Sequence, residues 1–220
     1  MNDRLIEILL DSFWKIVLPG LTMTIPLTII SFAIALILAL IIAMIQVSNI
    51  NPLKQFARFY VWVIRGTPLL VQLYVIFYGL PNLGILIEPF PAAIIVFALN
   101  TSAYDAETIR AAIEAIPVGQ FEAGYCVGMS TTQILFRIVL PQALRIAFPS
   151  LSNSLISLVK DTSLASNITI LEMLMATQRI IARTYEPFAL YCEVGLIYLI
   201  ICTLLTKVQH YFEKKYRMVY

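Results

Sequence analysis

The feature that most constrains this chain is a series of long segments without a single charged side chain. The first, residues 16–53, and the second, residues 66–87, contain no Asp, Glu, Lys or Arg. Three more follow, at 89–104, at 146–159 and, interrupted only by Glu193, at 187–206. A helix needs roughly 20 mostly apolar residues to cross a bilayer core. The pattern therefore predicts a chain that folds inside a membrane as several helices.

The composition agrees with a membrane environment. Hydrophobic residues make up 60% of the 220 residues and charged residues 13%, whereas a soluble domain carries about 25% charged residues. A core of this size could not hide so much apolar surface. The net charge of +2 excludes a strongly basic nucleic-acid binder. Three scattered cysteines and one histidine exclude a disulfide framework, and no metal site is predicted.

We predict an all-α, integral membrane protein whose residues 1–220 form a single transmembrane domain. The five expected spans are residues 18–47, 60–80, 90–112, 146–166 and 187–207. The residues before the first span include Asp3, Glu7 and Asp11, and a signal peptide would instead begin with basic residues. The first segment is therefore expected to stay as a membrane anchor.

Lys and Arg near the ends of the spans predict the orientation, because these residues favour the cytoplasmic side. If the N-terminus is outside, ten of the 15 basic residues lie on the inner side. The outer side then holds only Arg4, Lys15, Lys160, Arg179 and Arg183. We expect a multi-pass protein with its N-terminus outside and its C-terminus in the cytoplasm.

A cytoplasmic loop, residues 114–145, carries helix signals of its own. Pro117 suits the first turn of a helix, and Gly128 is expected to end that helix. Ser130 with Gln133 predicts a capping box that starts a second helix, and Pro141 should end or kink it. Two short helices at a bend are typical either of a docking site for a partner protein or of helices that rest on the membrane surface.

The residues of this loop resemble a known motif. Glu122-Ala123-Gly124, Gly128 and Ile138-Val139-Leu140-Pro141 are similar to the EAA loop of ABC importer permeases. That loop runs Glu-Ala-Ala, three residues, Gly, nine residues, Ile-x-Leu-Pro. The spacing agrees throughout, and Gly124 departs from the third-position Ala, which lowers the local helix propensity by about 1 kcal/mol.

Five further segments within about residues 58–165 resemble the polar amino acid branch of these permeases, in the family's order. They are Arg65–Gln72, Asn100–Tyr104, Ile116–Gln120, Pro141–Arg145 and Leu158–Leu164. Within that branch the sequence most resembles L-cystine permeases. The resemblance implies a prokaryotic cytoplasmic (inner) membrane protein whose Glu122, Ala123, Gly124, Gly128, Leu140 and Pro141 couple to an ATPase.

The resemblance also implies partners. They are cytoplasmic ABC ATPase subunits, a second permease copy or a sister permease, and an extracytoplasmic substrate-binding protein, all in contact with membrane lipid and without nucleic acid. The sequence has no Gly-x-x-x-x-Gly-Lys-Ser/Thr phosphate loop. ATP and Mg are therefore expected on the partner ATPase, and this chain is predicted to be neither an enzyme nor a cofactor protein.

Polar residues at membrane depth are costly and invite a functional interpretation. Asn100, Tyr104 and Glu107 share one helix face, which suits either a substrate cavity or a polar seam between helices. In the second region, Lys160, Thr162 and Ser163 could donate to a substrate carboxylate, with Asp161 or Glu107 accepting from its ammonium group. Lys160 and Asp161 could instead stabilise a break between helices. The candidate substrate-pathway residues are Asn100, Thr101, Tyr104, Glu107, Lys160, Asp161, Thr162 and Ser163.

Two other charged residues receive a structural interpretation. Arg65 is expected to be an interfacial anchor or a dimer contact, and Arg110 is expected to pair with Glu107 or Glu114 at helical spacing. The role of Asp105 stays open.

The resemblance thus implies the permease subunit of an ABC importer for a polar amino acid, with L-cystine as a candidate substrate. A self-contained, ion-coupled secondary amino acid carrier is the alternative, although such carriers usually have more spans and internal repeats. A membrane enzyme is a third class, for which no His-Glu-x-x-His pair is present. The amino acid, and the choice between a homodimer and a heterodimer, stay open.

Overall fold

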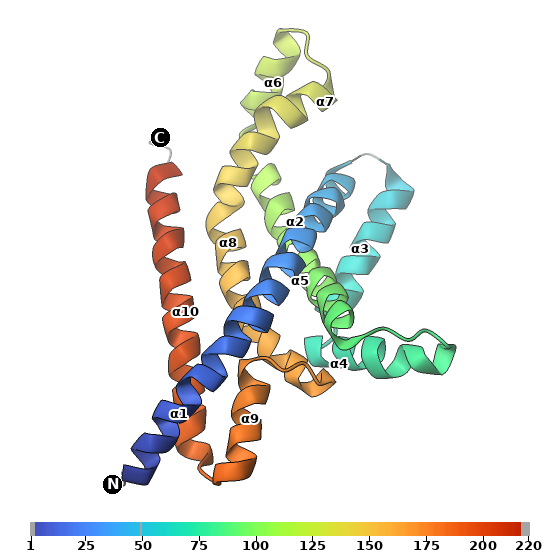
Figure 1. The fold of residues 1–220 in the computed structure, drawn as a ribbon. Helices are drawn as coiled ribbons and strands as arrows, with labels where there is room; N and C mark the ends of the chain where they lie inside the picture. The colour runs from blue at the N-terminus through green and yellow to red at the C-terminus, as the bar shows by residue number, and fades with distance from the viewer. Residues whose placement is uncertain (1–2, 49, 217–220) are drawn as a thin grey trace.

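The computed structural model describes residues 3–48 and 50–216, and these residues form helices and connecting turns without a β-strand (Figure 1). The all-α prediction is confirmed. The α-helices are α1 Asp3–Pro19, α2 Ile25–Val47, α3 Asn51–Arg65, α4 Leu69–Tyr74, α5 Pro89–Glu114, α6 Val118–Cys126, α7 Thr131–Ile134, α8 Leu140–Asp161, α9 Met173–Thr184 and α10 Pro187–Tyr216.

Helices α1 and α2 form one long helical segment, Asp3–Val47. The predicted first span, 18–47, therefore covers only part of it. A π-helical turn, Gly20–Thr24, joins the two helices, and such wide turns let a helix accommodate proline, here Pro19 and Pro26. Gly20 also allows a close approach, because a Cβ at this position would lie 2.7 Å from Sδ of Met173. The N-terminal helix is thereby held against α9.

The predicted second span, 60–80, is divided in the structure. Helix α3 ends at Arg65 and α4 begins at Leu69, with a bend of 101° between α3 and the helical residues that follow. Pro68 disfavours helical geometry at the residue before it, and Gln72 donates to the backbone carbonyl oxygens of Ile64 and Thr67 at 2.8 and 3.1 Å. Pro68 therefore favours the break between α3 and α4, and the hydrogen bonds of Gln72 stabilise it.

Helix α5 packs along α2 through small side chains. Ala39 and Ala43 of α2 and Ala106 of α5 are buried in one cluster, and such small residues let membrane helices approach closely. Helix α5 covers the predicted span 90–112. It is not among the described helices whose length and hydropathy suit a membrane span, and its second half carries charged residues.

By that criterion, the described part of the chain has three helical segments able to cross a membrane. They are Asp3–Val47, Thr131–Ile168 and Pro187–Lys215, and the bent pair Asn51–Arg65 and Leu69–Leu83 is a fourth candidate. The second of them continues past Pro141, so of the two predicted outcomes, an end or a kink of the helix, the end is wrong. A π-helical turn, Leu135–Val139, lies directly before Leu140 and Pro141, and such local adjustments re-satisfy the backbone groups that a proline frees in a membrane helix. The helix that begins at Thr131 therefore continues through α8.

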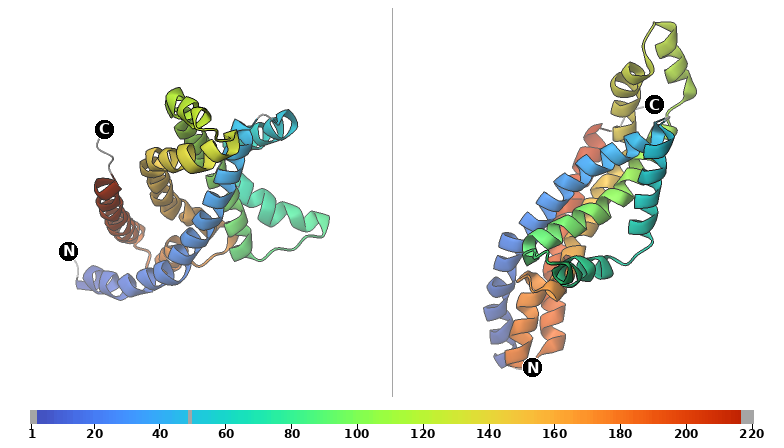
Figure 2. Two further views of the ribbon diagram at one scale, coloured as in Figure 1. Left: turned by 90° about the horizontal axis from the view of Figure 1, so that it is seen from above. Right: turned by 90° about the vertical axis from the view of Figure 1, so that its right-hand side faces the viewer.

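The first turn of α1 and the last turn of α10 lie toward opposite ends of the molecule (Figures 1 and 2). Helices α6 and α7 project at the end where α10 finishes, whereas α1 begins at the other end, beside α9. Arg4 of α1 donates there to the carbonyl oxygen of Thr184. The projecting helices α6 and α7 are therefore far from the start of α1 (Figure 1).

Candidate functional site

The projecting loop has the local geometry that the sequence predicts. Helix α6 ends at Cys126, and Gly128 follows with φ of 78°, in the left-handed region that glycine adopts without strain. Ser130 then caps α7. Its Oγ accepts from the backbone N–H of Gln133 at 3.3 Å, while the side chain of Gln133 accepts from the backbone N–H of Ser130 at 2.9 Å. The predicted capping box is confirmed.

Gly124 has a packing role that the family pattern does not explain. It is buried against Ile134, and a Cβ at position 124 would lie 2.5 Å from Cγ1 of Ile134. The alanine usual at this position would therefore collide with α7. The two short helices pack more closely than an alanine would allow.

The other predicted coupling residues divide into exposed and buried. Glu122, Ala123 and Pro141 are exposed, whereas Leu140 is buried in the cluster that joins this loop to α2 and α5. Large apolar side chains are also exposed on the loop, namely Val118, Tyr125, Val127 and Phe136. Exposed apolar groups beside Glu122 are typical of a docking surface.

A polar cavity of about 610 Å³ lies where the break between α3 and α4 meets α5 and α8. Its lining side chains are mostly polar or charged. Four predicted pathway residues line it, which are Asn100, Thr101, Tyr104 and Asp161. The structure therefore brings residues from the two predicted regions, about 60 positions apart, to one cavity.

The remaining predicted pathway residues do not line this cavity. Lys160 is exposed beside it, and Ser163 lies in the following 3₁₀ helix, Thr162–Ile168. Thr162 is fully buried and donates to the carbonyl oxygen of Val159 at 2.7 Å. Its hydroxyl stabilises the end of α8. The predicted donor cluster of Lys160, Thr162 and Ser163 is therefore not assembled in this structure.

Arg65 lines the cavity, although the sequence suggested only an anchor or a dimer contact. Its guanidinium carbon lies 5.1 Å from the ring centroid of Tyr104, a cation–π distance. The nearby Gly66, Thr67 and Pro68 line the same cavity. The available signal was the Gly-Thr-Pro break directly after Arg65, which turns the chain at this point.

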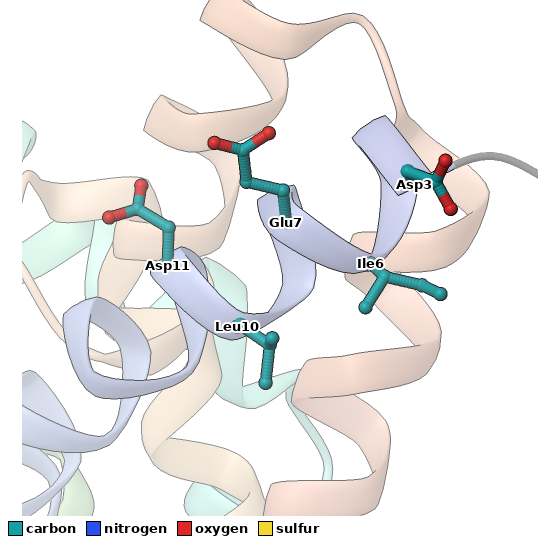
Figure 3. A pocket seen from close by; sticks show the side chains of 5 residues that line it. All are labelled: Asp3, Ile6, Glu7, Leu10 and Asp11. Atoms are coloured by element: carbon teal, nitrogen blue, oxygen red, sulfur yellow. The ribbon is translucent and has the colours of Figure 1, made fainter.

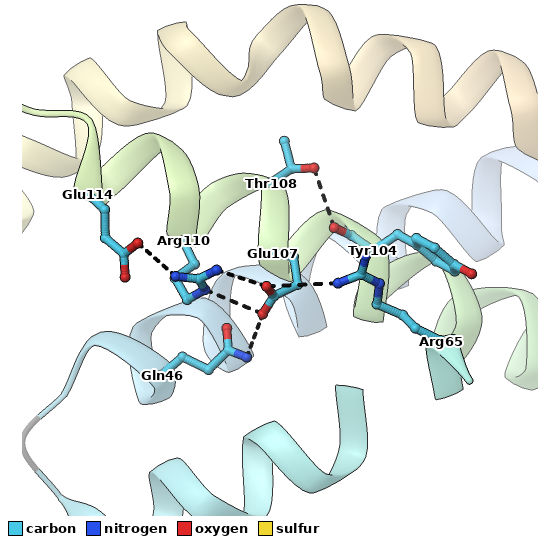
Figure 4. A network of polar contacts seen from close by, with 7 residues as sticks. All are labelled: Gln46, Arg65, Tyr104, Glu107, Thr108, Arg110 and Glu114. Atoms are coloured by element: carbon cyan, nitrogen blue, oxygen red, sulfur yellow. Dashed lines mark hydrogen bonds and ion pairs between the residues drawn. The ribbon is translucent and has the colours of Figure 1, made fainter. Parts of the chain in front are cut away.

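Glu107 lies at the centre of a polar network that ties three helices together (Figure 4). It accepts from Gln46 of α2 at 2.8 Å and from Arg110 at 2.9 Å, and Arg65 of α3 is 3.8 Å away. Arg110 also donates to Glu114 at 2.7 Å, so the predicted pairing of Arg110 is confirmed. Glu107 thus joins helices instead of lining the cavity.

Two further polar pairs border the cavity. Asn100 donates to Gln72 at 3.1 Å and so connects α5 to the break after α3. Asp105, whose side chain has 2% of its surface exposed, bonds to Ser154, a cavity residue. Its Oδ2 has no hydrogen-bond partner among the described residues. The only sequence signal for Ser154 was the serine-rich composition of this helix.

A separate hollow lies on α1 and is lined by Asp3, Ile6, Glu7, Leu10 and Asp11 (Figure 3). Its lining comes from one helix only, and its three carboxylates follow each other at four-residue spacing. Among residues 3–48 and 50–216, no group of three or more His, Cys, Asp or Glu side chains is placed to hold a metal ion. This hollow brings together none of the predicted site residues.

Residues 35–218 match the family of the binding-protein-dependent transport system inner membrane component. The chain belongs to this family. The prediction of an ABC importer permease is confirmed, and the alternative of a self-contained secondary carrier is not supported.

Individual members of the family resemble this permease over most of its length. The L-cystine transport system permease protein TcyB of Bacillus subtilis (strain 168) is 49% identical over 210 residues, which cover 95% of this chain and 90% of that protein. The probable amino-acid ABC transporter permease protein PatM of Vibrio harveyi is 42% identical, with 84% and 85% covered. The predicted resemblance is therefore confirmed.

Solved structures agree with the fold. A structure described as an amino acid ABC transporter with histidines has a chain that is 34% identical, with a TM-score of 0.89 and coverage of 98% of this permease and 100% of that chain. A structure of the MetNI methionine ABC transporter in an inward-facing conformation has a TM-score of 0.72 at 20% identity, with 98% and 99% covered, and supports the fold alone. The permease is thus a helical inner membrane component of a transport system.

Proposed function

We propose that this permease translocates a polar amino acid, with L-cystine as the favoured substrate. The identity of 49% with TcyB supports this substrate. The observation that carries the proposal is that a cation, Arg65, and an anion, Asp161, line the same cavity of about 610 Å³. A zwitterionic amino acid needs such a pair.

Each charged group of the substrate would meet a side chain of opposite charge in this cavity. The guanidinium of Arg65 presents a planar set of donors that suits a carboxylate. The carboxylate of Asp161 would accept from the substrate ammonium group, and Asn100 and Tyr104 offer further polar contacts from α5. L-cystine has two amino acid ends, so a second permease copy would supply an equivalent pair for the second end.

The complete transporter requires further subunits. In this proposal two ATPase subunits bind and hydrolyse ATP with Mg, and they dock on the exposed face of α6 near Glu122. A substrate-binding protein delivers the amino acid on the opposite side of the membrane. The separation of α6 and α7 from the start of α1 supports an N-terminus outside and a C-terminus in the cytoplasm (Figure 1).

The test is uptake of radiolabelled L-cystine into proteoliposomes that contain the permease, its ATPase and its binding protein. Wild type should transport only with internal or external ATP accessible to the ATPase. Arg65→Gln and Asp161→Asn should each lower uptake by about tenfold or more, because a hydrogen bond to a charged group contributes about 1.5–3 kcal/mol. Asp11→Asn, on the separate α1 hollow, is the matched control. Transport without ATP, or normal uptake by both cavity variants, would contradict the proposal.

A further inference from the structure

The side chain of Gln72, in the first turn of α4, reaches back to the break between α3 and α4. Its Nε2 donates to the carbonyl oxygens of Ile64 and Thr67 at 2.8 and 3.1 Å, and to Oγ1 of Thr67 at 2.8 Å. That hydroxyl already donates to the carbonyl oxygen of Val63 at 3.0 Å, so toward Gln72 it is an acceptor. A reversed amide would place Oε1 against three oxygens that offer it no hydrogen. The break therefore fixes the amide of Gln72, with its nitrogen toward α3 and its oxygen away from it.

The oxygen of Gln72 in turn fixes the amide of Asn100 on α5. Oε1 of Gln72 accepts from Nδ2 of Asn100 at 3.1 Å. An amide oxygen cannot donate, so only this orientation of Asn100 forms the hydrogen bond. Within residues 3–48 and 50–216, Oδ1 of Asn100 accepts no hydrogen bond, yet it is not one of the buried acceptors that lack a partner. Oδ1 of Asn100 is therefore an accessible acceptor.

This acceptor belongs to the polar cavity. Asn100 is half-buried, and it lines the cavity together with Arg65 and Asp161. An ammonium group carries three N–H donors and no acceptor. Asp161 offers it a carboxylate, and Oδ1 of Asn100 offers it a second, neutral acceptor. A reversed amide of Asn100 would present N–H donors instead, which suit a carboxylate.

We infer that Gln72 is a positioning residue for substrate recognition. This inference rests on the proposed function, because it requires a zwitterionic substrate in the polar cavity. Gln72 is not among the residues that line this cavity. It acts through Asn100, whose Oδ1 it directs toward the ammonium group of the substrate. The hydrogen bonds that stabilise the break after α3 thus also select amino acids over carboxylates that lack an amino group.

The experiment compares two ligands of the purified permease assembled with its ATPase. They are L-cystine and 3,3′-dithiodipropionic acid, which is the same disulfide diacid without the amino groups. Binding of radiolabelled L-cystine and its displacement by unlabelled dithiodipropionic acid give both dissociation constants. The substrate-binding protein is omitted, because it selects ligands itself. The selectivity is the Kd of dithiodipropionic acid divided by the Kd of L-cystine.

Gln72→Met keeps the approximate size of the side chain but removes the amide, so Asn100 is free to turn. The selectivity should fall about 3- to 10-fold, the loss expected for one hydrogen bond. A purely structural role of Gln72 would weaken the binding of both ligands equally and leave the selectivity unchanged. Gln178→Met makes the same chemical change at an exposed position of α9 and should keep the wild-type selectivity.

A second variant, Asn100→Leu, removes the acceptor but leaves the hydrogen bonds between Gln72 and the break in place. It should lower the selectivity at least as much as Gln72→Met, and it decides the matter even if Gln72→Met proves unstable. Because Gln72 acts through Asn100, the double variant should be no less selective than Asn100→Leu alone. A further loss in the double variant, or wild-type selectivity in either single variant, would overturn the inference alone. Failure of the wild type to bind L-cystine would contradict the proposed substrate and the inference together.

Discussion

Nη1 of Arg65 lies 3.8 Å from Oε2 of Glu107, a contact that joins the last turn of α3 to α5. This distance allows an ion pair without a short hydrogen bond. The other two partners of Glu107, Gln46 and Arg110, are at 2.8 and 2.9 Å. Two short hydrogen bonds therefore fix the position of Glu107. Arg65 makes only the longer contact with Glu107 and a cation–π contact with Tyr104, and it also lines the polar cavity. A substrate carboxylate could replace the weak contact of Arg65 without disturbing the rest of the network.

Replacing Arg65 by lysine should separate charge from geometry. Lysine keeps the positive charge but loses the planar donors and the stacking on Tyr104. We expect the KM for transport to rise about 3- to 10-fold, because a net hydrogen bond contributes about 0.5–1.5 kcal/mol. Uptake kinetics in proteoliposomes measure this change. Arg58→Lys, an exposed position on the same helix, should leave the KM unchanged, and an equal effect of both variants would refute a specific role for Arg65.

Replacing Glu107 by glutamine should weaken the junction between helices rather than substrate contact. The neutral amide leaves Arg110 and Arg65 with one negative partner fewer, and Gln46 with a weaker acceptor. We expect a lower thermal unfolding temperature of the detergent-solubilised permease, with a cost of about 1–3 kcal/mol. Glu114→Gln, in the exposed outer part of the network, should cost less. A change in KM without loss of stability would instead place Glu107 in the substrate path, as the sequence suggested.

The contact between Gly124 and Ile134 predicts a specific mutational pattern. Gly124→Ala should destabilise the loop by about 1–3 kcal/mol because of overpacking, although alanine favours helices more than glycine does. Gly119→Ala in the same helix meets no atom within 4 Å and should not destabilise it. Combining Gly124→Ala with Ile134→Ala should cost less than the sum of the two single changes. Additive costs in a double-mutant cycle of thermal stability would exclude the contact.

The coupling role of the loop is tested by binding of the ATPase. Gly128→Val introduces a β-branched side chain at φ of 78°, with strain of about 1–3 kcal/mol, and should weaken ATPase binding in a pull-down assay. Gly128→Asn, a residue that tolerates this geometry, should bind nearly normally. Glu122→Lys reverses a charge on the exposed face of α6 and should also weaken binding. Full recovery of the ATPase with both Gly128→Val and Glu122→Lys would favour the alternative of helices that rest on lipid.

The orientation is tested with single cysteines in a background without Cys126, Cys192 and Cys202. A cysteine in place of Asn82, which is exposed in the structure, should react with an impermeant reagent added outside. One in place of Lys214 should react only after permeabilisation. Labelling of both from outside would overturn the predicted orientation.

The sequence alone determined the class of the molecule. Charge-free segments longer than a bilayer crossing specify a membrane protein, because exposed charge is the strongest local barrier to insertion. Short-range signals also determined the loop, since Gly128 and the pair Ser130 and Gln133 act within one or two helical turns. The spacing of Glu107, Arg110 and Glu114 likewise predicted their ion pairs.

Only the tertiary structure decided which polar residues meet. Arg65 and Asp161 are distant in sequence and come together because the chain breaks after α3 and α8 packs beside α5. In the same packing, Glu107 connects α5 to α2 and α3. Thr162 is buried and donates to the backbone carbonyl oxygen of Val159. The local pattern at Pro141 predicted an end or a kink of the helix, and the structure has a continuous helix with a π-helical turn directly before it. Side-chain periodicity specifies the face of a helix, and only the packing of helices specifies what that face meets.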